Sequence, residues 1–320
     1  MTVPDDRYDD WHTPDGSRAE QATHVLAHLS DPHLTETGVR YNGVLDADAA
    51  LDRAVGVLQE AASGGRRFDA VVLSGDLTDT GDLHAYRRLA GAVGSVQGPD
   101  HSPQLIFATG NHDVRVQFHR QLLDRDEAGP ILQVHDIRGL RVIVLDSTVV
   151  GAGHGRLTDE HLDELRSELA TAAPAGTILV LHHAPVPPPS PLLSYFALEA
   201  TSRRALSAAI DGTDVRMILA GHHHLAQSAM LGPVPIAVAG STAIRTDPLA
   251  PAGHERTWAS GTFNVIEVYP DTIVASVIPV DGAAVVFDLD SAGCAAIIDA
   301  HPIPTGRGQG RRPSNEAVTR

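Results

Sequence analysis

The 320-residue chain contains no lysine, and all 24 of its basic residues are arginine. A lysine Schiff base and a phosphate-binding P-loop both need a lysine amine, so both mechanisms are excluded. The single cysteine, Cys294, permits no internal disulfide and fits a reducing compartment. No apolar run approaches the roughly 18 residues that a membrane span needs, and the chain shows no secretory signal. We therefore expect a cytoplasmic protein without a transmembrane span.

Positive charge is scarce overall. The formal net charge is −16, and such an acidic surface disfavours nucleic-acid binding and a nuclease activity, which need a basic face. Hydrophobic residues make up 42% and charged residues 20% of the chain, as is usual for a soluble globular protein. The length allows a large core in one or two domains.

Composition divides the chain into a body and two tails. Residues 1–23 are polar and acidic, and we expect a disordered arm there. Residues 24–304 are expected to form a single domain. Residues 305–320 contain glycine, proline and four arginines, which predicts a flexible tail; its peripheral association with a cell envelope is left open.

Strands and helices alternate in the first half of the chain. Short apolar runs predict strands over 24–30, 70–73 and 104–108, and apolar residues at helical spacing predict helices over 46–62 and 83–96. Right-handed crossovers between parallel strands would bring the three strand ends to one edge of a sheet. The further expected elements are strands over 131–137, 141–146, 177–181, 215–220, 263–269, 272–279 and 283–289, a hairpin over 226–239, helices over 158–170 and 199–210, and irregular segments over 184–193 and 240–261.

The second half of the chain is therefore expected to supply a β-rich sheet. The architecture that follows is two packed sheets with helices outside, in one domain.

A polar turn, Gly110-Asn111-His112-Asp113, follows the third expected strand. Strand ends are where α/β sheets place their functional side chains. The Asn111 amide oxygen can bind a hard metal, and His112 can donate a proton near neutral pH. Asp113 can hold the imidazole in place.

Metal-capable side chains also follow four other expected strands: Asp31 with His33, Asp76 alone, His182, and His222 with His224. Each alone has a plainer explanation. The pair His182-His183, for example, fits a core histidine followed by a surface one. Five such strand ends in succession exceed coincidence and predict a two-metal site.

Asp76 is the natural bridge between two ions because it stands alone, whereas the other candidates come in pairs. His223, between two candidate ligands, is expected to point away. Imidazole and oxygen donors suit Fe, Mn, Co or Zn better than Mg or Ca. No thiolate takes part, which excludes a structural zinc finger.

The order of these motifs resembles the calcineurin-like metallophosphoesterase superfamily. The stretches Leu29-Ser30-Asp31-Pro32-His33 and Gly221-His222-His223-His224 are similar to those of bacterial class III cyclic nucleotide phosphodiesterases of the mycobacterial type. The resemblance covers about residues 24–279. It implies a four-layer αββα sandwich of two packed mixed sheets flanked by helices, and a homodimer.

The resemblance also implies roles for individual residues. His112 would donate a proton to the leaving group, and Asp113 would orient the His112 ring. Asn111, His112 and His154 would contact the phosphate. Two metal ions, Fe and Mn with Zn or Co as alternatives, would be held by seven side chains: Asp31, His33 and His224 for the first, Asn111, His182 and His222 for the second, and Asp76 between them.

The activity implied is hydrolysis of 3′,5′-cyclic nucleotides (cAMP, with cGMP and 2′,3′-cyclic nucleotides as further substrates) to nucleoside monophosphates, by a hydroxide that bridges the two metals. Two alternatives stay open: a broad-specificity metallophosphoesterase acting on other small phosphodiesters or monoesters, and a scaffold protein that kept the fold. The expected substrate walls are 39–44, 185–193 and 240–261. The candidate stacking aromatics are Tyr41, Tyr195 and Phe196.

Overall fold

The computed structural model describes residues 20–98 and 101–300. Within it, Ala22–Gly282 form one compact unit, and the described residues from Ala283 onward belong to a second unit. The expected single domain over 24–304 thus ends near Gly282 instead. The expected tail over 305–320 and most of the expected arm over 1–23 lie outside the described residues.

The first unit contains all the described strands. In chain order they are β1 (His24–Leu29), β2 (Ala70–Leu73), β3 (Gln104–Phe107), β4 (Leu132–Ile137), β5 (Leu140–Leu145), β6 (Thr177–His183), β7 (Val215–Gly221), β8 (Gln227–Leu231), β9 (Val234–Val238), β10 (Arg245–Thr246), β11 (Thr257–Trp258), β12 (Thr262–Val268) and β13 (Ile273–Pro279).

Most of the described helices connect these strands. They are α1 (Ala47–Ser63), α2 (Leu83–Gly94), α3 (Arg115–Phe118), the π-helix η2 (His119–Leu123), α4 (Asp159–Leu169), α5 (Pro191–Tyr195), α6 (Ala200–Ile210) and, in the second unit, α7 (Ser291–Ala300). None of the helices in the described ranges is both long enough and apolar enough to cross a membrane.

The first sheet has five strands in the order β13-β12-β1-β2-β3. β1, β2 and β3 are parallel, as expected, so their carboxyl ends share one edge. β12 pairs antiparallel with β1, from His24 opposite Val268 to His28 opposite Asn264. The expectation that the second half supplies its own sheet is therefore wrong for β12 and β13, which complete the sheet begun by the first strands.

The second sheet has six strands in the order β4-β5-β6-β7-β9-β8. β5, β6, β7 and β9 are parallel, and β4 and β8 are antiparallel strands at the two edges. The expected hairpin is β8–β9, with Gly232 in the left-handed conformation at its turn. The carboxyl ends of β6 and β7 therefore also share one edge.

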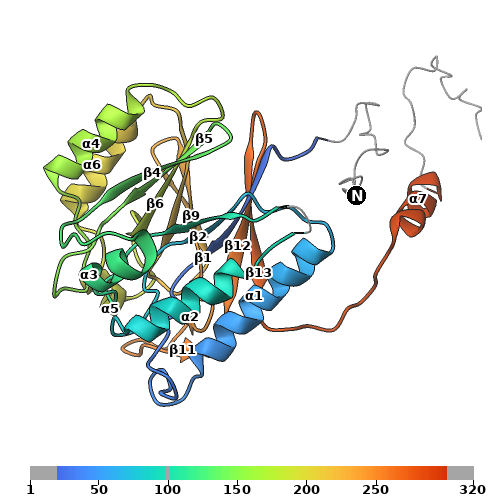
Figure 1. Ribbon diagram of the computed structural model, residues 1–320, viewed down its shortest axis with the longest axis horizontal. Coiled ribbons are helices and arrows are strands. Elements are labelled where there is room, and N and C mark those ends of the chain that lie inside the picture. Colours follow the sequence, from blue (N-terminus) through green and yellow to red (C-terminus); the bar gives the residue numbers. More distant parts are fainter. Residues whose placement is uncertain (1–19, 99–100, 301–320) are drawn as a thin grey trace, which may run out of the picture. The chain divides into compact units, whose positions relative to one another are not determined.

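Three apolar cores separate four layers. Alternate residues of each strand face opposite sides, so Val71 packs beneath α1 and α2 while Val72 packs between the two sheets. In the second sheet, Val180 faces the core between the sheets and Leu179 faces α4 and α6. Figure 1 shows α4 and α6 side by side on one side of the sheets and α1 and α2 on the other. The expected αββα sandwich is confirmed.

Several segments differ from the expected elements. α5 forms at the end of the segment expected to be irregular, because the Ser190 side chain caps it and Pro191 fits the first turn of a helix. The short pair β10–β11 forms within the expected loop over 240–261. Residues 283–289 are not a strand: no described strand pairs with them, and Val286 is 92% exposed. Apolar residues alone do not make a strand without a partner edge.

One arginine joins the two sheets at the end where β7 begins. The Arg216 guanidinium donates to the carbonyls of Ala175 (3.2 Å), Tyr269 (2.7 Å) and Thr272 (2.8 Å). Tyr269 and Thr272 form the turn between β12 and β13 of the first sheet. This contact holds the sheets together at the end opposite to His222.

We expect Arg216→Ala to lower the free energy of unfolding by about 2–4 kcal/mol, because it leaves three carbonyls without their charged donor. Urea unfolding followed by circular dichroism measures this loss. As a matched control, Arg166→Ala removes an exposed pair with Asp163 and should cost at most about 0.5 kcal/mol. Equal losses in both variants would contradict the role of Arg216.

Candidate metal centre and substrate pocket

The predicted ligands gather at the carboxyl edges of the two sheets. Asp31 and His33 follow β1, Asp76 follows β2 and Asn111 follows β3, whereas His182 lies near the end of β6. His222 and His224 follow β7. All seven side chains approach one another, in two groups of donor atoms.

The first group joins Asp31, His33 and His224. The Nε2 atoms of His33 and His224 lie 3.0 Å apart, and His224 Nε2 lies 3.2 Å from Asp31 Oδ1. Asp31 and His33 are buried, while His224 is 17% exposed. Four donor atoms, with one from Asp76, lie within 4.8 Å of one another, which is close enough to share one ion.

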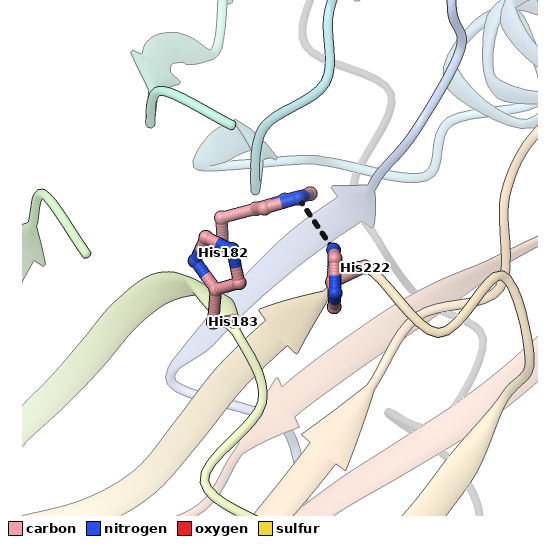
Figure 2. A group of neighbouring side chains, drawn as sticks. All are labelled: His182, His183 and His222. Carbon is pink, nitrogen blue, oxygen red and sulfur yellow. Dashed lines mark hydrogen bonds between the residues drawn. The ribbon is translucent and has the colours of Figure 1, made fainter. Parts of the chain in front are cut away.

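The second group joins Asn111, His182 and His222. His182 Nε2 lies 3.1 Å from Asn111 Oδ1 and 3.2 Å from His222 Nδ1, the contact drawn in Figure 2. His182 donates from its other nitrogen, Nδ1, to the Ser74 carbonyl. His222 donates from Nε2 to the Phe196 carbonyl. Each ring therefore turns its other nitrogen toward the group, which is the arrangement of metal-binding histidines.

Asp76 lies between the two groups. Its Oδ2 is 3.7 Å from His33 Nε2 and 3.3 Å from His182 Nε2. Its Oδ1 accepts from the backbone N–H of His112 at 2.8 Å. One oxygen thus holds a loop in place, and the other faces both groups.

The donor atoms fit metal ions. Asp31 repeats the pattern of Asp76: Oδ2 accepts from the His222 backbone N–H at 3.0 Å, whereas the buried Oδ1 makes no hydrogen bond and faces His224 Nε2. Burying a carboxylate oxygen and imidazole lone pairs against each other is costly without a cation. The set, with a carboxylate shared between two groups, suits a dinuclear centre with nitrogen and oxygen ligands.

The backbone at these positions is unusual as well. Of the eight described non-glycine residues with left-handed backbone, five are predicted ligands: Asp31 (φ 52°), His33 (φ 47°), Asp76 (φ 49°), His222 (φ 71°) and His224 (φ 50°). Each such residue costs about 1–3 kcal/mol and persists only where the surroundings hold it. Strain concentrated on one set of polar side chains indicates a functional site.

The charges of the site favour ionised carboxylates. Burial opposes the ionisation of Asp76, but His182 and His33 outweigh it and hold the pKa of that carboxyl well below its usual range. Burial likewise opposes protonation of His182, but the Asp76 carboxylate raises the pKa of His182 to about 9. The buried acidic groups thus remain anionic at neutral pH and attract cations.

His112 lies beside the metal groups and contacts Asp79. Its Nδ1 donates to the Asp79 carbonyl at 3.0 Å and lies 3.2 Å from Asp79 Oδ1. Burial opposes protonation of the ring, but the hydrogen bond to Asp79 and the charge of Asp76 outweigh it and raise the pKa of His112 to about 9. Asp79 and Asp76 therefore favour the protonated form of the His112 ring.

The expected role of Asp113 as the group that orients His112 is wrong. The Asp113 carboxylate accepts instead from the backbone N–H groups of Gly110, Leu77 and Thr78, and from the Tyr86 hydroxyl at 2.9 Å. It ties the turn after β3 to the turn after β2. Burial raises the pKa of Asp113 to about 6. The contact of Asp79 with His112 was not predicted from the sequence, although Asp79 lies only three residues after the predicted ligand Asp76.

A pocket of about 360 Å³ opens beside both groups. Beyond the residues of the metal groups and His112, one wall is apolar and comes from Leu192, Leu193 and Phe196 with Gly153. The other comes from the loop over 240–261. It consists of Thr246, Glu255 and Thr257. The segments over 185–193 and 240–261 therefore contribute to the lining as expected, but 39–44 does not.

Three of the other residues expected to contact the substrate, His154, Tyr195 and Tyr41, are not part of this lining. The His154 side chain is not part of the lining, and its Nε2 lies 3.5 Å from Glu199 Oε1. Tyr195 is 79% exposed, and the Tyr41 ring packs 5.0 Å from the His33 ring. Of the three expected aromatics, only Phe196 lines the pocket.

Two histidines next to predicted ligands are buried. His183 is fully buried, so the alternative of a surface residue is wrong. His223 is also fully buried, and its Nδ1 lies 2.7 Å from the Gln227 side chain.

Known proteins resemble this chain in sequence and in fold. The model of the calcineurin-like phosphoesterase family matches residues 24–226. A cAMP/cGMP dual specificity phosphodiesterase from Mycobacterium tuberculosis is 42% identical over 273 residues, which cover 84% of each chain. A probable cyclic nucleotide phosphodiesterase from Rhodococcus erythropolis is 44% identical over 259 residues, which cover 80% of this chain and 83% of that one.

Among solved structures, a dimetal phosphatase from Danio rerio shares the fold with a TM-score of 0.58 at 13% identity. The match covers 82% of this chain and 98% of that one.

Divalent metal should stabilise the metal-stripped protein, because it binds the folded chain and not the unfolded one. At a concentration of 100 Kd the gain is about 2.7 kcal/mol for one site. Thermal unfolding with and without Mn²⁺ measures the gain, and elemental analysis gives the stoichiometry. Asp76→Asn should reduce both, whereas the exposed Asp163→Asn should leave both unchanged. If Mn²⁺ leaves the Tm of the wild-type protein unchanged, the assignment of these residues as metal ligands is wrong.

Proposed function

The chain belongs to the calcineurin-like phosphoesterase family, and we propose that it hydrolyses 3′,5′-cyclic nucleotides to nucleoside monophosphates, with cAMP and cGMP as substrates and 2′,3′-cyclic nucleotides as further ones. The observation that carries this proposal is the geometry of the site. Two donor groups share the Asp76 carboxylate, and both groups and His112 open onto one pocket. The names of the two relatives that are 42% and 44% identical support the choice of substrate.

The seven predicted ligands would hold two metal ions. When bound, these ions supply an activated water and neutralise charge on the phosphoryl oxygens. The donor set of imidazole, carboxylate and amide supports Fe and Mn, with Zn or Co as alternatives. We also propose a homodimer, as the resemblance to class III enzymes implies, and a cytoplasmic location.

His112 would act as the general acid. Because its Nδ1 donates to Asp79, the ring offers Nε2 to the leaving oxygen of the substrate. The cationic ring can then protonate the alkoxide as the cyclic ester opens. Asn111 would direct its amide N–H groups to a phosphoryl oxygen, since Oδ1 already faces His182.

The walls of the pocket would hold the nucleoside. Leu193 and Phe196 offer an apolar surface for a base, and Thr246 and Thr257 offer hydroxyl groups opposite. The same donor groups could also serve other small phosphoesters, so substrate choice depends on these walls.

Hydrolysis of 3′,5′-cAMP and bis-p-nitrophenyl phosphate tests the function. Metal-stripped protein with Mn²⁺ added back should cleave both, and Asn111→Ala should cleave neither. His112→Ala should lose about 10²–10⁴-fold on cAMP. It should lose little on the aryl ester, because p-nitrophenolate leaves without a proton.

The exposed His84→Ala is the control and should keep both activities. Cleavage of the aryl ester alone by the wild type would keep the metal centre but remove cAMP as substrate. Equal losses on both esters in His112→Ala would contradict its role as acid.

The pH profile tests the contact between His112 and Asp79. The carboxylate favours the protonated ring, so Asp79→Asn should lower the pKa of His112. The alkaline limb of kcat/KM for cAMP should then move to lower pH by about one unit or more. The limb for bis-p-nitrophenyl phosphate should not move, and an equal shift for both substrates would assign the limb to another group.

A further inference from the structure

His183 is fully buried beside the metal groups, although the proposed mechanism gives it no part. Its backbone N–H donates to Ser147 Oγ at 3.2 Å. On the ring, Nε2 lies 3.1 Å from the Gly153 carbonyl and Nδ1 lies 2.9 Å from Ser147 Oγ. Because a carbonyl only accepts, Nε2 carries the proton and Nδ1 accepts from the serine hydroxyl. The backbone N–H and both ring nitrogens of His183 are thus hydrogen-bonded.

The His183 ring also packs against two predicted ligands of the second metal. Its centroid lies 4.6 Å from that of His222 and 5.0 Å from that of His182. Figure 2 shows the three rings gathered at the ends of β6 and β7. His183 therefore limits how far the His222 ring can rotate or retreat.

The glycine that His183 binds supports the wall of the substrate pocket. A Cβ on Gly153 would lie 2.5 Å from Phe196 Cδ1, so the Phe196 ring packs directly on the Gly153 backbone. Gly155 has a similar constraint, since its Cβ would lie 2.4 Å from His183 Cγ. The loop thus fits closely between the Phe196 ring and the His183 ring.

Phe196 in turn contacts His222, the predicted metal ligand. Its carbonyl accepts from His222 Nε2 at 3.0 Å. The contacts therefore form a ring of four residues: His222 to Phe196, Phe196 to Gly153, Gly153 to His183, and His183 to His222. Displacing any one of these four residues would therefore change the contacts that hold the other three in place.

We propose that His183 is a positioning residue that holds His222, a ligand of the second metal, and the pocket wall at Phe196 as one unit. This inference rests on the proposed function only in that His222 binds a metal and Phe196 faces the substrate. It predicts that a change at the pocket wall alters metal affinity, although no metal ligand has been replaced.

Gly153→Ala is the sharpest test, because its methyl group must push Phe196 away. Titration of metal-stripped protein with Mn²⁺, followed by calorimetry, measures the two affinities. We expect the weaker-binding step to lose about 10-fold or more in affinity, as with other residues that support a metal ligand. KM for cAMP should rise as well. Gly129→Ala has free space around its Cβ and should change neither.

His183→Leu and His183→Gln separate packing from hydrogen bonding. Leucine fills the space but loses both bonds, whereas the glutamine amide can still donate to the Gly153 carbonyl. We expect His183→Leu to weaken one Mn²⁺ step about 10–100-fold, and His183→Gln to restore part of that loss. His161→Leu replaces another buried histidine, on α4, and should leave both steps unchanged.

The outcomes differ clearly. If Gly153→Ala and His183→Leu lower Tm but bind both Mn²⁺ ions as the wild type does, His183 is only a structural residue and the proposal is overturned. If His183→Leu does not fold, Gly153→Ala decides alone. If the coupling appears but the wild type does not cleave cAMP, the positioning role holds and the proposed substrate fails.

Discussion

The Asp76 carboxylate is the interaction on which the rest of the site depends. One oxygen holds the turn after β3 through the His112 backbone, and the other lies between the two groups of donor atoms. A small rotation of this side chain would change both groups and the position of His112 together. Gly110 allows the close approach, since a Cβ there would lie 2.0 Å from the Asp76 backbone nitrogen.

The site is also a contact between two sheets. β1, β2 and β3 bring two carboxylates, the amide of Asn111 and the imidazole of His33, whereas β6 and β7 bring only imidazoles among the predicted ligands. Each sheet thus contributes part of each donor group. The packing of the two sheets therefore sets the distances within both groups, and residues far from the site, such as Arg216, help to maintain them.

The sequence predicted the strand ends and the polar side chains that gather at them, because short apolar runs and the turns that follow are local features. The packed layers and the hairpin β8–β9 followed from the same patterns. Contacts between loops were not predictable in this way. Asp113 is next to His112 in sequence, but the backbone turns its carboxylate toward Tyr86, and Asp79 fills its expected place. The pairing of β12 with β1 depends on edge availability, which local sequence does not encode.

The pairing of β1 with β12 has a consequence for how the protein is made. β1 is synthesised before the other described strands, with Asp31 and His33 directly behind it, whereas β12 follows more than two hundred residues later. Until then, one edge of β1 has no partner, and His222 and His224 have been synthesised only shortly before. The set of seven predicted ligands is therefore incomplete until His224 has been synthesised, and we expect metal loading only after that point.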